Sequence, residues 1–140
     1  MELEDLLAPN SSPIDLRSED RWGAIDELVS ELVATRRIQP NDQAAVAAAL
    51  KHREMAMTTG IGYEIGIPHA STHLVTEVVG VIGRSRKGIN FEALDGKPVK
   101  LVVLFLVPAG ELKKHLNTLA NIARLLQQED FRQGLWQRLM

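Results

Sequence analysis

The stretch Thr59-Gly60-Ile61-Gly62-Tyr63-Glu64-Ile65-Gly66-Ile67-Pro68-His69 combines three glycines with a short apolar run that ends in Pro-His. The first two glycines permit sharp backbone bends, whereas Pro68 fixes its own φ and favours an extended Ile67. We therefore expect His69 to leave a short strand at a fixed angle and to arrive at a surface. A rigid mount of this kind suits a nucleophilic or ligand histidine, because imidazole titrates near neutral pH. A buried structural histidine can use the same geometry, so the stretch alone leaves both interpretations open.

Strands are expected on both sides of this stretch. Residues 100–107 form a continuous β-branched and apolar run, which is typical of a central strand buried on both faces. Residues 75–82 predict a second strand, followed by a polar turn at 84–88. Shorter strands are expected at 14–16 and 65–67.

Helices are expected at about 19–37, 42–55, 111–127 and 128–139, where apolar residues recur at helical spacing. Ser18 and Asn41 are the candidate N-caps of the first two helices. Helices at both ends of a strand-rich middle predict the α/β (α+β) class, a three-layer α/β/α sandwich in which helices flank a mixed sheet. No repeat or linker interrupts the chain, so residues 1–140 are expected to form a single domain.

Composition narrows the function classes. The net charge of −2 gives no electrostatic argument for nucleic acid or an anionic membrane. The chain has no cysteine, which excludes disulfides, thiol catalysis and zinc–thiolate sites. Its acidic start is unlike a secretory signal, and its longest apolar run, 101–107, is far shorter than the ~20 residues that span a bilayer. We expect a cytoplasmic protein with no direct membrane insertion.

Three side chains are the main candidates for chemistry. Besides His69, His115 lies in the first turns of the helix expected after the central strand, where free N–H groups favour phosphate and a neutral imidazole. Taken alone, His115 is better interpreted as an exposed helix residue, as is His52. Arg53, at a helix end, is expected to face solvent or to cap carbonyl groups. If it faces His69, it can hold a phosphoryl oxygen instead.

Other chemistry fits the sequence poorly. His69 and His73 have a zinc-like spacing only in a helix, whereas Pro68 indicates an extended chain, and no cysteine completes a site. The glycine spacing matches neither the dinucleotide-binding nor the P-loop pattern, and no Gly-x-Ser-x-Gly motif is present. No metal and no cofactor is therefore expected.

The run from Thr59 to Gly62 followed by Ile67-Pro68-His69 resembles the active-site motif of the fructose/mannitol-type IIA domains of the bacterial phosphoenolpyruvate-dependent phosphotransferase system. The nitrogen-regulatory IIA proteins belong to the same family. The similarity extends over most of the chain, since several further segments agree in order and spacing: Arg53-Glu54, Leu94–Val99, the strand to Val107-Pro108, His115-Leu116, Leu119-Ala120, Arg124–Leu126 and Phe131-Arg132.

The resemblance implies a phosphocarrier. A phosphohistidine on the small carrier HPr would hand its phosphoryl group to His69, which would pass it to a cysteine of a IIB domain. By the same resemblance, His115 supports the phosphoryl group and Arg53 stabilises its charge. No cofactor is implied. No IIB or IIC segment is found in the sequence, so separate IIB and IIC partners are expected.

The chain departs from the family pattern at two places near the histidine. Tyr63-Glu64 stands where the family usually has Asn-Gly, and Ala70 where it often has Gly. We expect Glu64 to place a negative charge near the phosphoryl group, at a cost of about 1–4 kcal/mol if the separation is ~4 Å. Besides the sugar-transport carrier, two alternatives stay open: a regulatory relay of the nitrogen type, and a non-catalytic binding module that kept the fold. A metal-binding protein that uses His69 and His73 is the least favoured.

Overall fold

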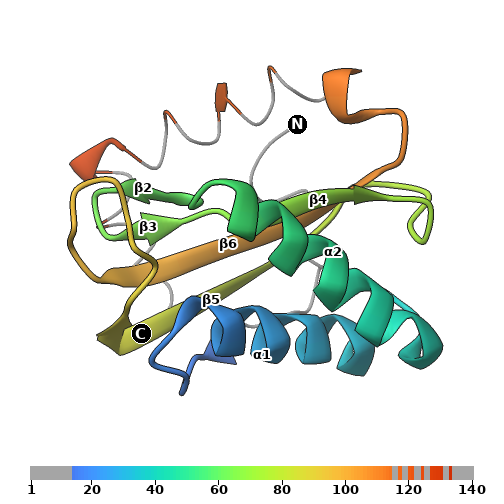
Figure 1. Cartoon of the computed structure of the whole chain (residues 1–140), viewed down its shortest axis with the longest axis horizontal. Coiled ribbons are helices and arrows are strands. Elements are labelled where there is room, and N and C mark those ends of the chain that lie inside the picture. Colours follow the sequence, from blue (N-terminus) through green and yellow to red (C-terminus); the bar gives the residue numbers. More distant parts are fainter. Residues whose placement is uncertain are drawn as a thin grey trace.

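The computed structural model describes residues 14–114, 117, 120, 121, 124, 127–130 and 133 (Figure 1). Its helices and strands are β1 (Ile14–Asp15), α1 (Arg21–Ala34), the 3-10 turn η2 (Pro40–Asp42), α2 (Gln43–Ala56), β2 (Gly60–Gly62), β3 (Ile65–Gly66), β4 (His69–Thr72), β5 (Val79–Ile89) and β6 (Val99–Pro108). The strands form one six-stranded mixed sheet in the order β1-β5-β6-β3-β2, with β4 also paired to β6. Helices flank this sheet, which confirms the predicted α/β class.

Strand β6 is the centre of the sheet, as its uninterrupted apolar sequence predicts. It pairs antiparallel with β5 along one side and parallel with β3 and β4 along the other. Every β6 residue except Lys100 is buried. Burial on both faces requires apolar side chains at successive positions, which explains why no alternation is seen in this segment.

Strands β3 and β4 form one interrupted line of strands that pairs with the same side of β6. Ile65 lies opposite Leu101, and His69 lies opposite Phe105, so the register is the same before and after the interruption. The break falls at Pro68, which has no N–H to donate to a ladder. The sequence predicts the first part as a strand but not the second, which begins at His69 itself.

Helices α1 and α2 pack against each other, α1 also against β5 and α2 also against β4. Figure 1 shows them side by side along the sheet. The buried residues of α1 recur at helical spacing and belong to the hydrophobic core: Ala24, Ile25, Leu28, Val29 and Leu32. The ends of both helices differ from the prediction. Asp20, not Ser18, caps α1 by accepting from Gly23 N at 2.8 Å, and α2 starts after η2 with no side-chain cap.

The largest difference from the predicted strands concerns β5. It begins at Val79, because residues 75–78 form a loop, and it continues through the expected turn at 84–88 to Ile89. The sequence signal for a turn has a physical basis, since the register shifts between Arg84 opposite Leu101 and Ile89 opposite Val99. The intervening residues form a bulge inside an extended strand rather than a reversal of the chain.

The C-terminal region begins as predicted, with Leu112, Lys113 and Lys114 in helical conformation. Most of the helices expected at 111–127 and 128–139 lie outside the described residues. Within the part of the chain that is described, no helix has the length and apolar character to cross a membrane.

Candidate functional site

His69 begins β4 directly after Pro68, and its side chain is half-buried. Its ring stacks on that of Phe105, the residue opposite it on β6, with centroids 5.3 Å apart and an interplanar angle of 17°. Phe105 is 2% exposed and is therefore a fixed part of the core. The imidazole thus rests on a rigid platform while it stays partly accessible.

A hydrogen bond defines which ring nitrogen of His69 is available for chemistry. Nδ1 lies 2.8 Å from the carbonyl oxygen of Ile67. A carbonyl oxygen can only accept, so Nδ1 carries the proton and donates it. In the neutral ring the lone pair is then on Nε2. The backbone two residues upstream therefore selects Nε2 as the nucleophilic or ligand nitrogen.

The surroundings of His69 favour the neutral ring. Burial lowers the pKa of His69 below its usual value of 6.5, and the positive charge of Arg53 acts in the same direction. The hydrogen bond to Ile67 O and the negative charge of Glu54 act against this lowering of the pKa. Burial is the largest of these effects, so Nε2 keeps its lone pair at neutral pH.

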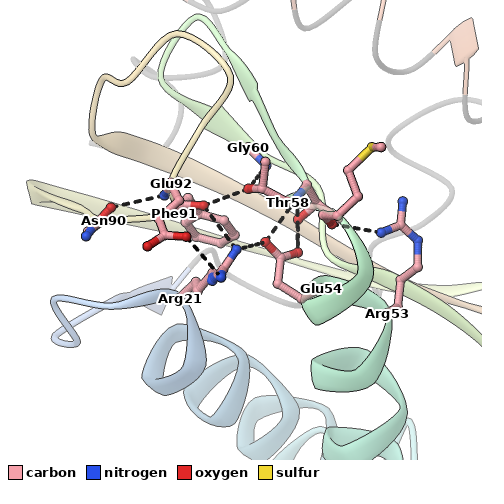
Figure 2. Close-up of polar contacts among 10 residues, drawn as sticks. Arg21, Arg53, Glu54, Thr58, Gly60, Asn90, Phe91 and Glu92 are labelled. Atoms are coloured by element: carbon pink, nitrogen blue, oxygen red, sulfur yellow. Dashed lines mark hydrogen bonds and ion pairs between the residues drawn. The ribbon is translucent and has the colours of Figure 1, made fainter.

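Arg53 lies in the last turn of α2 and donates from Nη1 to the carbonyl oxygen of Met57 at 2.9 Å (Figure 2). The sequence-based interpretation of Arg53 as a capper of carbonyl groups is therefore confirmed. Its positive charge also helps to lower the pKa of His69, although burial is the larger cause.

The structure separates the other histidines from this site or does not describe them. His52 is exposed on α2, as expected of a solvated helix residue. His73 is exposed in the turn after β4, and the extended chain between it and His69 lacks the helical spacing of a zinc pair. The described residues contain no group of three or more potential metal ligands. His115 lies outside the described residues, so its role stays a prediction.

The turn Tyr63-Glu64 is farther from His69 than expected. Both residues have positive φ, 57° and 65°, which is the conformation of a two-residue hairpin turn between β2 and β3 and explains why Asn-Gly suits these positions. From Leu101, opposite Ile65, to Phe105, opposite His69, β6 rises about 13 Å. Glu64 lies beyond Ile65, so the expected repulsion at ~4 Å is wrong. Its carboxylate instead lies 3.9 Å from Lys100 Nζ.

Of the two glycines expected to permit bends, Gly62 fits that expectation, whereas Gly60, like Gly66, is needed for close packing. Only Gly62 has a positive φ, 93°. A Cβ at Gly60 would lie 2.8 Å from the Ala93 side chain, and one at Gly66 would lie 3.0 Å from the Phe91 ring. These positions need glycine because β2 and β3 pack closely against the segment after β5.

A cavity of about 740 Å³ lies beside the hairpin of β2 and β3. It is lined by the hairpin, by the segment before β6 and by two residues near the C-terminus, including Tyr63, Glu64, Lys97, Lys100 and Glu129. His69 is not among the residues that line this cavity.

Sequence analysis missed the internal role of Glu54. This carboxylate is 1% exposed and accepts hydrogen bonds from Thr59 N and Thr59 Oγ1. A signal was present, since Glu54 continues the buried face of α2 that Val46 and Leu50 define at intervals of four residues. A charged residue at a helix end is usually solvated, so this spacing alone is a weak signal of burial.

Comparison with known proteins agrees with this geometry. The family model described as "Phosphoenolpyruvate-dependent sugar phosphotransferase system, EIIA 2" matches residues 5–138. The chain is 42% identical over 113 residues to the fructose-specific EIIA component of Haloferax volcanii, which covers 81% of this chain and 72% of that protein. It is 35% identical over 135 residues to a nitrogen regulatory protein of Bradyrhizobium diazoefficiens, which covers 96% of this chain and 86% of that protein.

The fold is also shared with solved structures. The crystal structure of the nitrogen regulatory protein IIA-Ntr from Neisseria meningitidis superposes with a TM-score of 0.84 at 27% identity, covering 99% of this chain and 90% of that one. The fructose-specific EIIABC component of Bacillus subtilis is much longer, and the chain spans 21% of its length at 34% identity. The match over nearly the whole sequence and the shared fold show that the chain belongs to the EIIA type 2 family of the phosphoenolpyruvate-dependent sugar phosphotransferase system.

Proposed function

We propose that this chain is a phosphoryl carrier that accepts a phosphoryl group on Nε2 of His69 and passes it to a cysteine of a IIB component. The observation that carries the proposal is the commitment of Nδ1 to Ile67 O, which leaves Nε2 as the nucleophile of a half-buried ring with a lowered pKa. The proposed donor is a phosphohistidine on an HPr-like carrier, and membership of the sugar phosphotransferase family supports this choice. These transfers are proposed to take place in the cytoplasm.

The proposed step balances without a metal or cofactor. The lone pair of His69 Nε2 attacks phosphorus, the new N–P bond forms, and the N–P bond of the donor breaks. The bonding electrons return to the donor nitrogen. Little covalent work is left to the protein, so catalysis rests on positioning and on stabilising charge. In the second transfer the thiolate of the IIB cysteine attacks phosphorus and His69 Nε2 is the leaving group.

Two further side chains have proposed supporting roles. Arg53, whose charge already lowers the pKa of His69, is assigned to phosphoryl oxygens, for which its guanidinium has donors in a planar fork. In the structure one of these donors is on Met57 O, and rotation of the side chain would exchange that contact for the phosphoryl group. His115 is assigned to support of the phosphoryl group, and we expect His115→Ala to be phosphorylated but to transfer onward more slowly.

Phosphorylation by purified enzyme I and HPr tests whether His69 is the nucleophile. The protein is incubated with phosphoenolpyruvate, enzyme I and HPr, and the product is examined for an acid-labile, base-stable phosphate. We expect one phosphate per chain in the wild type, none in His69→Ala, and wild-type labelling in His73→Ala, which removes a nearby exposed histidine. ¹⁵N NMR of the labelled protein should place phosphorus on Nε2. Labelling that survives His69→Ala, or phosphorus on Nδ1, would contradict the proposal, and no labelling at all would favour a non-catalytic binding module.

A regulatory relay is the second candidate, favoured by the coverage of the nitrogen regulatory relatives. Both candidates require phospho-His69, so the next step separates them. Purified phosphoprotein is mixed with a fructose-type IIB component and with a variant of that component that lacks its cysteine. Rapid loss of label to the intact IIB component alone supports the transport carrier, whereas a phosphohistidine that persists with both supports the regulatory relay.

A further inference from the structure

Glu54 is a buried carboxylate to which the chemistry above gives no role. It lies in the last turn of α2, is 1% exposed, and accepts from Thr59 N at 3.0 Å and from Thr59 Oγ1 at 2.5 Å. A third partner is Arg21, whose Nη1 lies 3.2 Å from Oε1 (Figure 2). A buried charge is stable only when its hydrogen bonds are satisfied. The concentration of donors on Glu54 therefore fixes the position of Thr59 relative to both helices.

A continuous series of hydrogen bonds leads from Thr59 to the imidazole. The carbonyl oxygen of Thr59 accepts from Ile67 N at 2.9 Å, and the carbonyl oxygen of Ile67 accepts from His69 Nδ1 at 2.8 Å. Thr59 is 3% exposed and Ile67 is 7% exposed, so solvent offers little alternative to these bonds. Thr59, whose side chain is held by Glu54, is thus connected to the His69 ring through one backbone–backbone hydrogen bond and one bond from the ring to the backbone.

Arg21 anchors Glu54 from the other helix. Its guanidinium also donates to Phe91 O at 3.4 Å, pairs with Glu92 at 3.4 Å and lies 4.4 Å from the centroid of the Trp22 ring. Figure 2 shows Arg21 between Glu54 and the segment that follows β5. The carboxylate therefore connects α1, α2 and the start of β2 at one point.

We propose that Glu54 is a positioning residue for His69, which acts through Thr59 and Ile67 to hold the ring in the tautomer that leaves Nε2 as the nucleophile. This inference rests on the proposed function for its rate prediction but not for its tautomer prediction. The two neighbours at the end of α2 would divide the work, since Arg53 is assigned to the phosphoryl group, whereas Glu54 is buried and bonded to Thr59.

The effect of Glu54 on the pKa of His69 allows a positioning role to be distinguished from a direct effect of its charge. Its negative charge raises the pKa of His69, so removal of that charge favours the neutral ring still further. A charge effect alone would therefore leave as much neutral His69 as in the wild type, or more. Slower phosphorylation in Glu54→Gln would have to come from the position or tautomer of the ring.

Three variants test the series of hydrogen bonds that leads from Glu54 to His69. Glu54→Gln removes the charge, Thr59→Val removes only the hydroxyl donor, and Thr59→Ser restores that donor. Ile25→Val, in the core of α1, is the control for a general loss of stability. Urea unfolding establishes conditions in which all variants are folded.

Two readouts are compared in the full-length protein. ¹⁵N shifts of the histidine ring report the tautomer of His69, and we expect the Nδ1–H form in the wild type, in Thr59→Ser and in Ile25→Val. We expect a mixture of tautomers in Glu54→Gln and, to a smaller extent, in Thr59→Val. With saturating phospho-HPr, the rate of phosphorylation should fall about tenfold in Glu54→Gln, with a half-saturating concentration near that of the wild type.

The outcomes separate this inference from the proposed function. A wild-type tautomer and rate in both Glu54→Gln and Thr59→Val would overturn the positioning role, even if His69 is the phosphoryl acceptor. If the wild type takes no phosphate, the proposed function fails, while the tautomer measurement still decides whether Glu54 controls the ring. If Glu54→Gln does not fold, the comparison of Thr59→Val with Thr59→Ser decides, and equal tautomer populations in those two variants would refute the proposal.

Discussion

The Tyr63-Glu64 turn and the Ile67-Pro68-His69 step lie at different points along β6, although they are neighbours in the sequence: the turn precedes β3, and the step joins β3 to β4. The turn is exposed, contains two residues with positive φ, and carries an ion pair between two exposed side chains. The histidine step is held by hydrogen bonds at Ile67 N, Ile67 O and Pro68 O and by the ring of Phe105.

This difference shows which residues the fold must position accurately. A hairpin turn only has to reverse the chain, so a strained pair of residues is tolerated at a modest cost. A nucleophile has to be aimed, and small displacements of a reacting atom slow a reaction strongly. For the phosphoryl acceptor proposed above, the hydrogen bonds that converge on His69 are therefore interpreted as a functional requirement, and the turn and the histidine step can be tested separately.

The largest expected effect is at the platform of the histidine. Phe105→Ala removes a fully buried ring and should lower the free energy of unfolding by about 3–5 kcal/mol, as measured by urea denaturation. Phe105→Leu, which keeps most of the volume but no aromatic face, is the matched variant. We expect it to lose less stability than Phe105→Ala but to disturb the ring orientation of His69 as well. Wild-type ¹⁵N shifts of His69 in Phe105→Leu would show that stacking does not orient the ring.

The next effect concerns the close packing of β3. Gly66→Ala would bring a Cβ within 3.0–3.3 Å of three atoms of the Phe91 ring, and we expect a loss of about 1–3 kcal/mol in urea unfolding. The double variant Gly66→Ala with Phe91→Leu should lose less than the sum of the two single variants, because the smaller side chain relieves the clash. Additive losses would mean that Phe91 is not the obstacle.

At the Tyr63-Glu64 turn, a double substitution should raise the stability of the protein. Replacing Tyr63-Glu64 by Asn-Gly places residues suited to positive φ in the turn and should raise the free energy of unfolding by about 1–2 kcal/mol. The backbone bonds from Lys100 N and Leu101 N to residue 64 O can remain.

The same double variant tests whether the charge of Glu64 is too far from His69 to affect its phosphorylation. The separation of about 13 Å exceeds the screening length of about 8 Å at physiological salt. The rate of phosphorylation by phospho-HPr should therefore stay within about twofold of the wild type. Glu64→Gln, which removes the charge but keeps the strained turn, is the control. A large acceleration in both variants would revive the repulsion that the sequence suggested.

The sequence predicts β6, the two N-terminal helices and the extended chain that leads to His69, because each depends on a local pattern. An apolar run specifies β6, helical spacing specifies α1, and Pro68 restricts the chain before His69. The exact caps and the start of β5 were wrong, because tertiary contacts select among several polar residues that suit a helix or strand end equally well.

The environment of the histidine was less accessible from the sequence. Glu54 is separated from His69 along the chain, and their connection depends on pairing between Thr59 and Ile67 that no local pattern reveals. Glu64 is much closer to His69 in sequence but distant in space, because an extended chain separates its residues by more than 3 Å per position. Sequence proximity therefore overestimated the influence of Glu64 on His69 and underestimated that of Glu54.

The smallest expected effect is the pH dependence of stability contributed by His69. Burial gives this side chain a lower pKa in the folded state than its usual value of 6.5, so the unfolded chain takes up the proton first as the pH falls. The unfolded state then binds more protons, and the free energy of unfolding decreases as the pH drops below about 6.5. His69→Gln cannot titrate and should have a gentler slope between pH 5 and 6.5 in urea unfolding, while the two slopes agree above pH 7.5. The difference between the two curves cancels the groups that both proteins share, so parallel curves below pH 6.5 would mean that folding does not disfavour the charged ring.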